Sequence, residues 1–403
     1  KAADLLEEQA GELAKTMARE MGKPVQQGRG EALKCANACR YYAGHAEAML
    51  ADETLAATDD GPRATIIHQP VGTVLAIMPW NFPLWQVFRF AAPALMAGNT
   101  AILKHASNVP RSARAIAEII REASGRDDLL VPVFVSGRIA AELIGDPRIH
   151  AVTFTGSTGA GRKVAEAAGR HLKKSVLELG GSDPYLVLED ADPAKAAAIC
   201  AAARMINGGQ SCIAGKRFLV DRKVHDIFME LFAMELRNYP LGDPLAEETK
   251  LGPMAREDLR DELHAQVTAS VAAGARLVMG GVIPDRAGAG YPATLLAEVT
   301  PGMRVFDEET FGPVAAVTLV DDLEEAIQLA NLTPFGLGSA VISGSHEKAV
   351  EIARRLQSGT VAINSQVVSD PRLPFGGVKE SGWGRELGAH GIREFVQVKT
   401  IAG

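Results

Sequence analysis

The 403-residue chain has few cysteines, no long apolar run and no cluster of basic residues. Four cysteines are too few for a disulfide framework, and none lies in a Cys/His group with metal-site spacing, so we expect no metal. No apolar run approaches the roughly 20 residues that cross a bilayer. A net charge of -7 argues against a nucleic-acid surface. Free cysteines fit a reducing compartment, and we therefore expect a cytoplasmic protein without nucleic-acid or membrane partners.

The first segment does not have the pattern of a targeting signal either. Residues 1–21 are amphipathic and carry acidic as well as basic side chains, unlike a signal peptide. The chain starts inside this helical pattern without an initiator methionine. We therefore expect the numbering to begin downstream of the natural N-terminus.

Alternating β and α patterns along most of the chain predict the fold class. A chain of this length exceeds a single core, so two or three domains are expected. The repeated patterns predict an α/β protein with two doubly wound parallel-sheet domains and helices on both faces of each sheet. Two further β segments, Ala64–Ile67 and Val71–Ile77, predict a ribbon that extends from the body and pairs with another subunit.

One cysteine has surroundings that suit a nucleophile. Cys212 follows two glycines, between an alanine-rich helical pattern and an apolar strand pattern. A lone cysteine in a loop is more often inert. Here, however, the small neighbours leave room for a substrate, and backbone N–H groups of the turn can point at an oxyanion. Glu178, flanked by leucines and followed by two glycines, is a candidate base whose pKa an apolar site would raise. The alternative is an ordinary solvated or salt-bridged carboxylate.

Three further features lie at the ends of predicted strands, where α/β proteins bind ligands. Asn81 supplies an amide donor or caps a turn. The turn Gly156–Gly161 precedes a helix, where N–H groups can bind a pyrophosphate, although a plain tight turn explains it equally well. Lys104 either binds a ribose or phosphate or is a surface lysine.

A set of six motifs, in order and properly spaced, makes the resemblance to a known family specific. The motifs are Pro79–Pro83, Phe154–Ser157, Leu177–Gly181, Gly209–Cys212, Glu309–Pro313 and Pro374–Gly377. Over nearly the whole chain they resemble the aldehyde dehydrogenase superfamily, and from this resemblance we expect that the chain lacks the family's first several dozen residues. The resemblance implies a homodimer or homotetramer. It also implies three parts. We assign a Rossmann-like NAD(P)-binding domain to residues 1–51 and 71–180, and a catalytic domain to residues 181–380. An oligomerisation or bridging element is assigned to residues 52–70 and 381–403.

The resemblance implies catalytic roles for three residues. Cys212 attacks the aldehyde and forms a thiohemiacetal, while Asn81 and the backbone N–H of Cys212 hold the oxyanion. Hydride passes to a nicotinamide and leaves a thioester, and Glu178 activates the water that hydrolyses it. Covalent capture in this way separates the oxidation from the hydrolysis.

The resemblance also implies that NAD or NADP is the cofactor. The residues assigned to binding it are Trp80, Lys104, Ser107, Gly156, Ser157, Leu179, Glu309, Phe311 and Phe375. Glu309 matches the family residue that binds the nicotinamide ribose. Ser107 stands where many NAD-preferring relatives carry a glutamate. A serine does not repel a 2′-phosphate, so NADP is permitted.

Several stretches resemble the bacterial succinate-semialdehyde dehydrogenase branch, which makes succinate semialdehyde the expected substrate. Arg89 matches an arginine that binds the substrate carboxylate, and a guanidinium suits that task. A second arginine of such relatives is replaced by Ile206. The loop Ser365–Arg372, at the family's substrate entrance, supplies the candidate substitutes Ser365, Ser369 and Arg372.

Three alternatives compete with this interpretation. The first is the same chemistry on another aliphatic or aromatic aldehyde. The second is a non-catalytic family member with a structural or binding role, which the retention of Cys212, Glu178 and Asn81 argues against. The third is a thiol hydrolase or esterase without a cofactor, which the stretches around Glu309 and Phe375 argue against.

Overall fold

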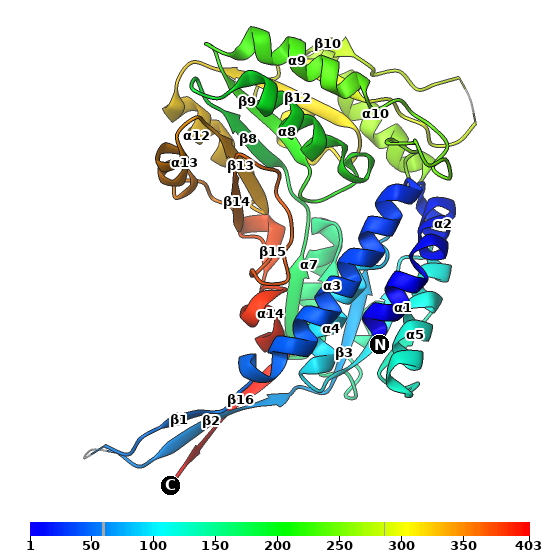
Figure 1. The fold of residues 1–403 in the computed structure, drawn as a ribbon, viewed down its shortest axis with the longest axis vertical. Helices are drawn as coiled ribbons and strands as arrows, with labels where there is room; N and C mark the ends of the chain where they lie inside the picture. The colour runs from blue at the N-terminus through cyan, green and yellow to red at the C-terminus, as the bar shows by residue number, and fades with distance from the viewer. Residues whose placement is uncertain (59–60, 286) are drawn as a thin grey trace.

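A computed structural model describes residues 1–58, 61–285 and 287–403 and confirms the expected α/β class (Figure 1). Residues 59 and 60 belong to the predicted segment 52–70 and lie outside the described residues. Within the described ranges the strands form sheets of six, seven and three strands. No helix in these ranges is long and apolar enough to cross a membrane.

The six-stranded sheet uses strands from the first half of the chain and one short strand near its end. In spatial order the strands are β15 (Gly382–Trp383), β7 (Lys174–Glu178), β6 (Ala151–Thr155), β3 (Thr73–Met78), β4 (Thr100–His105) and β5 (Leu130–Pro132). Only β15 pairs antiparallel in this sheet, as far as the structure describes it. The helices of this part are α1 (Ala2–Glu8), α2 (Ala10–Met21), α3 (Val25–Met49), α4 (Trp85–Met96), α5 (Pro110–Ser124), α6 (Gly137–Leu143) and α7 (Thr158–Arg170).

Local sequence explains these elements. Every residue of β6 is buried, as expected for a central strand covered on both faces. Helix α5 buries Ile116 and Ile120, which are four residues apart on one face. It starts at Pro110 and ends at Ser124, and the next residue, Gly125, has a φ of 70°, the left-handed conformation that favours glycine after a helix.

The seven-stranded sheet follows in the chain. In spatial order its strands are β10 (Arg276–Met279), β11 (Thr294–Ala297), β12 (Val314–Val320), β9 (Gly215–Asp221), β8 (Asp183–Val187), β13 (Gly338–Ile342) and β14 (Thr360–Ile363). The strand β10 is antiparallel to its neighbour. Its helices are α8 (Pro193–Met205), α9 (His225–Arg237), α10 (Glu257–Ala272), α11 (Arg304–Asp307), α12 (Leu323–Asn331) and α13 (His346–Ala353), with the short 3-10 helices η1 (Ile206–Gly209) and η2 (Lys379–Ser381).

The three-stranded sheet extends away from the body, at the bottom of Figure 1. It contains β1 (Glu53–Leu55), β2 (Ala64–Pro70) and β16 (Val396–Ala402), and helix α14 (Gly388–Arg393) precedes β16. The prediction that Ala64–Ile67 and Val71–Ile77 form one ribbon is wrong. The strand β2 pairs with β1 and β16, whereas β3 lies inside the six-stranded sheet. The reason is burial, because Val74 and Leu75 are fully buried and need cover on both faces.

The chain passes from the six-stranded to the seven-stranded sheet between β7 and β8. The predicted domain boundaries stay a prediction, and one feature complicates them. Strand β15 falls in the predicted segment 381–403, yet it pairs with β7 in the six-stranded sheet. The carboxyl ends of β3, β6 and β7 lie at one edge of that sheet, where ligands of α/β folds are bound.

Candidate active site

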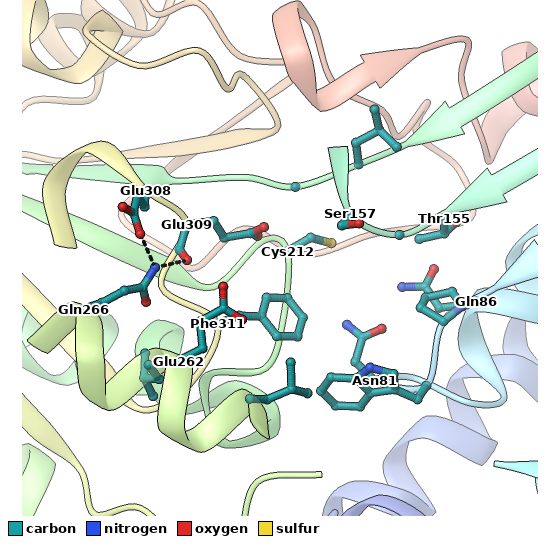
Figure 2. A pocket seen from close by; sticks show the side chains of 17 residues that line it. Asn81, Gln86, Thr155, Ser157, Cys212, Glu262, Gln266, Glu308, Glu309 and Phe311 are labelled. Atoms are coloured by element: carbon teal, nitrogen blue, oxygen red, sulfur yellow. Dashed lines mark hydrogen bonds between the residues drawn. The ribbon is translucent and has the colours of Figure 1, made fainter. Parts of the chain in front are cut away.

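A cavity of about 380 Å³ lies at this edge of the six-stranded sheet (Figure 2). Its walls come from the loops that follow β3, β6 and β7, from the loop before β9, from α10 and from the loop after α11. The lining residues are Pro79, Trp80, Asn81, Gln86, Thr155, Gly156, Ser157, Leu179, Gly180, Cys212, Leu259, Glu262, Leu263, Gln266, Glu308, Glu309 and Phe311. Eight of the residues predicted from the sequence therefore meet at one cavity: Cys212, Asn81, Trp80, Gly156, Ser157, Leu179, Glu309 and Phe311.

Cys212 projects its sulfur into this cavity, and the amide groups of Asn81 and Gln86 face the same space in Figure 2. The preceding turn has positive φ at Asn207, Gly208 and Gly209. A Cβ on Gly209 would collide with the backbone of Gly312, so the tight approach of the two loops requires glycine. Burial raises the pKa of the Cys212 thiol to about 12, although the positive charges of Arg89 and Lys216 oppose the shift.

The buried side chain of Lys216 supports the cysteine loop from behind. Its Nζ donates hydrogen bonds to the carbonyl oxygens of Ser211, at 3.0 Å, and Cys212, at 2.7 Å. The same ammonium lies 3.6 Å from a carboxylate oxygen of Glu309. Sequence analysis missed this residue. The signal was the Lys-Arg pair at positions 216 and 217 in a strand that is otherwise apolar and buried.

The amide of Asn81 is fixed against the cysteine loop. Its Nδ2 donates to the carbonyl oxygen of Gln210 at 3.1 Å. In return, Asn207 Nδ2 donates to the Asn81 carbonyl oxygen at 2.7 Å. Among the described residues, one of the two N–H groups of the Asn81 amide is used in this way. The other is available to a ligand oxygen beside Cys212.

Glu178 ends β7 and is only 2% exposed. Neither carboxylate oxygen has a hydrogen-bond partner among the described residues. Burial raises its pKa well above the usual value, and the nearby charge of Arg89 opposes this. Glu178 itself is not among the residues that line the cavity, whereas Leu179 and Gly180, which follow it, are. A Cβ on Gly376 would come within 2.9 Å of Glu178 Oε1, so glycine there leaves the carboxylate room.

The residues predicted to hold a cofactor fall into two groups. Within the cavity, Trp80 and Phe311 meet edge to face with ring centroids 5.8 Å apart, and Glu309 Oε1 accepts a hydrogen bond from the Gly181 N–H at 2.9 Å. Outside the described cavity lie Lys104, Ser107 and Phe375. Lys104 is half-buried, and burial lowers its pKa. Ser107 is exposed. The ring of Phe375 packs against the guanidinium of an arginine.

That guanidinium belongs to Arg89, which was predicted to bind a substrate carboxylate. Arg89 is 2% exposed and forms an ion pair with Glu386. Its Nη2 also reaches Thr155 Oγ1 at 3.4 Å, and its guanidinium lies 4.7 Å from the Phe375 ring centroid. In this arrangement the protein itself already balances the charge of Arg89.

The other predicted substrate residues lie in the loop after β14. Ser365 is exposed. Arg372 is 71% exposed at its side chain and pairs with Asp370 at 2.6 Å. Ser369 is buried and accepts hydrogen bonds from Lys34 and Trp85.

Sequence analysis missed other polar residues of the site, some of them distant along the chain and others next to a predicted residue. Gln266 of α10 donates to Glu308 Oε2 at 2.9 Å and to the Glu309 carbonyl oxygen at 3.2 Å, as the dashed lines in Figure 2 show. Gln86, Glu262 and Glu308 also line the cavity. No motif in the sequence singled these residues out.

Comparison with known proteins gives a consistent result. The model of the aldehyde dehydrogenase family matches residues 1–401. A probable succinate-semialdehyde dehydrogenase [NADP(+)] of Synechocystis sp. is 50% identical over 401 residues, which span 100% of this chain and 88% of that protein. The solved succinic semialdehyde dehydrogenase from Streptococcus pyogenes, in complex with NADP+ as the cofactor, is 37% identical with a TM-score of 0.97, covering 100% of this chain and 88% of the other. The lactaldehyde dehydrogenase from Escherichia coli is 30% identical with a TM-score of 0.95, covering 99% and 84% respectively.

Proposed function

The chain belongs to the aldehyde dehydrogenase family, and from that premise we propose that it oxidises succinate semialdehyde to succinate with NAD or NADP. The observation that carries the proposal is one cavity lined by the Cys212 thiol, the Asn81 amide and the Glu309 carboxylate. The cavity thus combines a nucleophile, a hydrogen-bond donor for the oxyanion and a carboxylate able to bind a ribose hydroxyl.

The first step is attack by Cys212. The thiol gives its proton to water, a sulfur–carbon bond forms at the aldehyde carbon as the C=O π bond breaks, and the carbonyl oxygen becomes an oxyanion. The unused N–H of Asn81 and the backbone N–H of Cys212 stabilise that oxygen in the thiohemiacetal. Because the pKa of the thiol is raised to about 12, the proton needs an acceptor before attack is fast at neutral pH.

The second half of the reaction is hydrolysis of the thioester. Water adds to the acyl carbon, the carbon–sulfur bond breaks, and Cys212 leaves as thiolate. Glu178 takes the proton from this water. Because burial raises the pKa of Glu178, its ionised carboxylate is a stronger base than that of an exposed glutamate.

The residues present fit a nicotinamide dinucleotide. Helix α7 begins directly after Gly156 and Ser157. In the part of the chain that the structure describes, Ser157 makes no side-chain capping bond, so the first N–H groups of the helix are available to a pyrophosphate. A Cβ on Gly161 would collide with Leu179, which shows how closely this helix approaches β7. When bound, the nicotinamide supplies the acceptor for the hydride that leaves the thiohemiacetal carbon.

The cofactor proposal favours NADP. The Synechocystis relative at 50% identity and a Mycobacterium leprae relative at 46% identity are both named as NADP(+) enzymes. Ser107 is exposed and uncharged, three residues after Lys104. This arrangement leaves room for a 2′-phosphate beside a positive charge.

Two finer parts of the proposal concern the substrate and the assembly. The alternative substrate is another aliphatic or aromatic aldehyde, since the lactaldehyde dehydrogenase shares the fold at a TM-score of 0.95. We also propose a homodimer or homotetramer in the cytoplasm. The projecting three-stranded sheet supports assembly because its apolar side chains Val398 and Ile401 are 66% and 55% exposed.

Steady-state assays test the proposed function. Reduction of NAD and of NADP should be followed with succinate semialdehyde, butanal and benzaldehyde as substrates. We expect the highest kcat/KM with succinate semialdehyde and no oxidation by Cys212→Ala. A Cys212→Ala variant that keeps full oxidation, or equal kcat/KM for butanal and succinate semialdehyde, would overturn the corresponding part of the proposal.

A further inference from the structure

Two buried charged residues from the N-terminal helices lie next to the segment that carries Asn81. Lys23 is in the turn between α2 and α3, and Glu31 is on α3. The two are 2% and 5% exposed and form an ion pair with each other. Neither is among the residues that line the described cavity, so any effect on the reaction has to pass through other residues.

Glu31 caps the beginning of α4. Its Oε1 accepts hydrogen bonds from the backbone N–H groups of Leu84, at 2.8 Å, and Trp85, at 2.9 Å. The first N–H groups of a helix have no partner within that helix, and among the described residues the N-cap residue of α4 makes no side-chain capping bond. The helix dipole also favours a carboxylate at this end. A residue 53 positions before Leu84 therefore fixes the start of α4.

Lys23 contacts the same segment. Its ammonium lies 4.0 Å from the centroid of the Phe82 ring, which is a cation–π contact. Burial lowers the pKa of Lys23, whereas the charge of Glu31 opposes that shift. Each buried charge depends on the other, because an unpaired charge in the interior is strongly destabilised.

The segment that these two residues hold follows Asn81 directly. On one side, the Asn81 amide is fixed to the cysteine loop through the carbonyl oxygen of Gln210 at 3.1 Å. On the other side, the contacts of Glu31 and Lys23 fix the backbone within four residues of Asn81. An oxyanion donor is effective only when its N–H already points to where the negative charge develops. Both anchors therefore bear on the direction of the Asn81 amide.

From this arrangement we propose that Glu31, with Lys23 as its counter-charge, is a positioning residue for the oxyanion donor Asn81. The inference rests on the proposed function, in which an N–H of Asn81 stabilises the thiohemiacetal oxyanion. Glu31 acts through the backbone at the start of α4 rather than on the reacting atoms. Without the cap the segment after Asn81 shifts, its N–H points away from the oxygen beside Cys212, and kcat falls.

Two double variants separate the cap from the charge. Lys23→Met/Glu31→Gln removes both charges but keeps an oxygen that can accept from Leu84 and Trp85. Lys23→Met/Glu31→Leu removes the charges and the oxygen. Double variants are used because a single change would leave a buried charge unpaired and could unfold the protein. We expect the kcat of the Leu variant to lie at least about tenfold below that of the Gln variant. Arg40→Met, which removes an exposed ion pair from the same helix, should leave kcat unchanged.

A double-mutant cycle with Asn81→Ala separates positioning from stability. If Glu31 acts through Asn81, Lys23→Met/Glu31→Leu should lower kcat less than about twofold once Asn81 is alanine. A loss by the same factor in both backgrounds, or an equal kcat for the Gln and Leu variants, would assign Glu31 to the fold alone and overturn the inference. The cycle uses whichever aldehyde the wild-type protein oxidises fastest, so an error in the proposed substrate leaves it intact. A wild-type protein that oxidises no aldehyde would instead refute the proposed function, and this inference with it.

Discussion

The ammonium of Lys216 donates a 2.7 Å hydrogen bond to the carbonyl oxygen of Cys212. It holds the neighbouring Ser211 carbonyl at 3.0 Å and lies 3.6 Å from Glu309. One fully buried cation therefore connects the loop of the nucleophile with the carboxylate proposed to bind the nicotinamide ribose. This makes Lys216 a positioning residue, because it touches the backbone of Cys212 rather than the reacting atoms.

Replacing Lys216 with Met should loosen this loop. Two buried carbonyl oxygens lose their donor, which should lower the free energy of unfolding by about 1–3 kcal/mol. We expect kcat to fall roughly tenfold or more, since the thiol is no longer held in its attack geometry. Thermal denaturation and steady-state kinetics measure the two effects. A weaker Kd for NADP, measured by fluorescence titration, is also expected because Glu309 loses its cation.

The outcome that contradicts this assignment is a Lys216→Met protein with lower stability but normal kcat and normal NADP binding. The lysine would then serve the fold alone. Lys223→Met is a suitable control, because Lys223 is an exposed lysine that pairs with Glu189 on the surface. Its loss should change neither kcat nor NADP binding.

Glu178→Gln should separate the two halves of the reaction. Glutamine keeps the size of the side chain but cannot accept a proton from water, so hydrolysis of the thioester should slow by about 100- to 10,000-fold. The first hydride transfer should slow much less. Rapid mixing should then show a burst of reduced cofactor close to one equivalent per active site, followed by slow turnover. A burst rate and a steady-state rate that fall by the same factor would instead make Glu178 a positioning residue.

The pKa of Cys212 predicts a pH dependence of alkylation. Burial raises that pKa to about 12 in the protein without ligands, so the thiolate is a minor species at neutral pH. The rate of reaction with iodoacetamide should rise about tenfold per pH unit between about pH 7 and pH 10. Mass spectrometry assigns the label, since Cys35 and Cys200 are buried and also have raised pKa values. A plateau near neutral pH would show that another group has already activated the thiol.

Contiguous motifs made much of the site predictable. Cys212 follows a short stretch with glycines and a serine, Asn81 lies in a stretch bounded by two prolines, and the cavity does bring the two together. Alternation of strand and helix patterns was likewise sufficient for the α/β class. The separation of β2 from β3 into different sheets was not predictable in this way, because β2 pairs with β16, more than 300 positions away. A local pattern shows that a strand forms but not which strand it pairs with.

The residues that the sequence did not reveal share one property, which is that their partners are distant. Lys34 is one of them: it donates a hydrogen bond to Ser369, 335 positions away, and alone it is an unremarkable lysine on a helix. Arg89 shows the converse case. Its type and position suggested a substrate ligand, while the counter-charge of Glu386 lies near the C-terminus and became apparent only in the fold. Charge balance in a buried site is a tertiary property, so single residue types do not reveal it.

Ser107→Glu tests the proposed preference for NADP. Ser107 is exposed, and Lys104 lies three residues before it at the end of β4. A carboxylate at this position would repel a 2′-phosphate but could accept hydrogen bonds from the two hydroxyls of an unphosphorylated ribose. We expect kcat/KM for NADP to fall by roughly tenfold or more, while kcat/KM for NAD stays level or rises. Ser107→Gln provides the uncharged control and should reduce NADP use much less. If both variants weaken NAD and NADP by the same factor, the position contributes to the shape of the loop and does not read the 2′-phosphate.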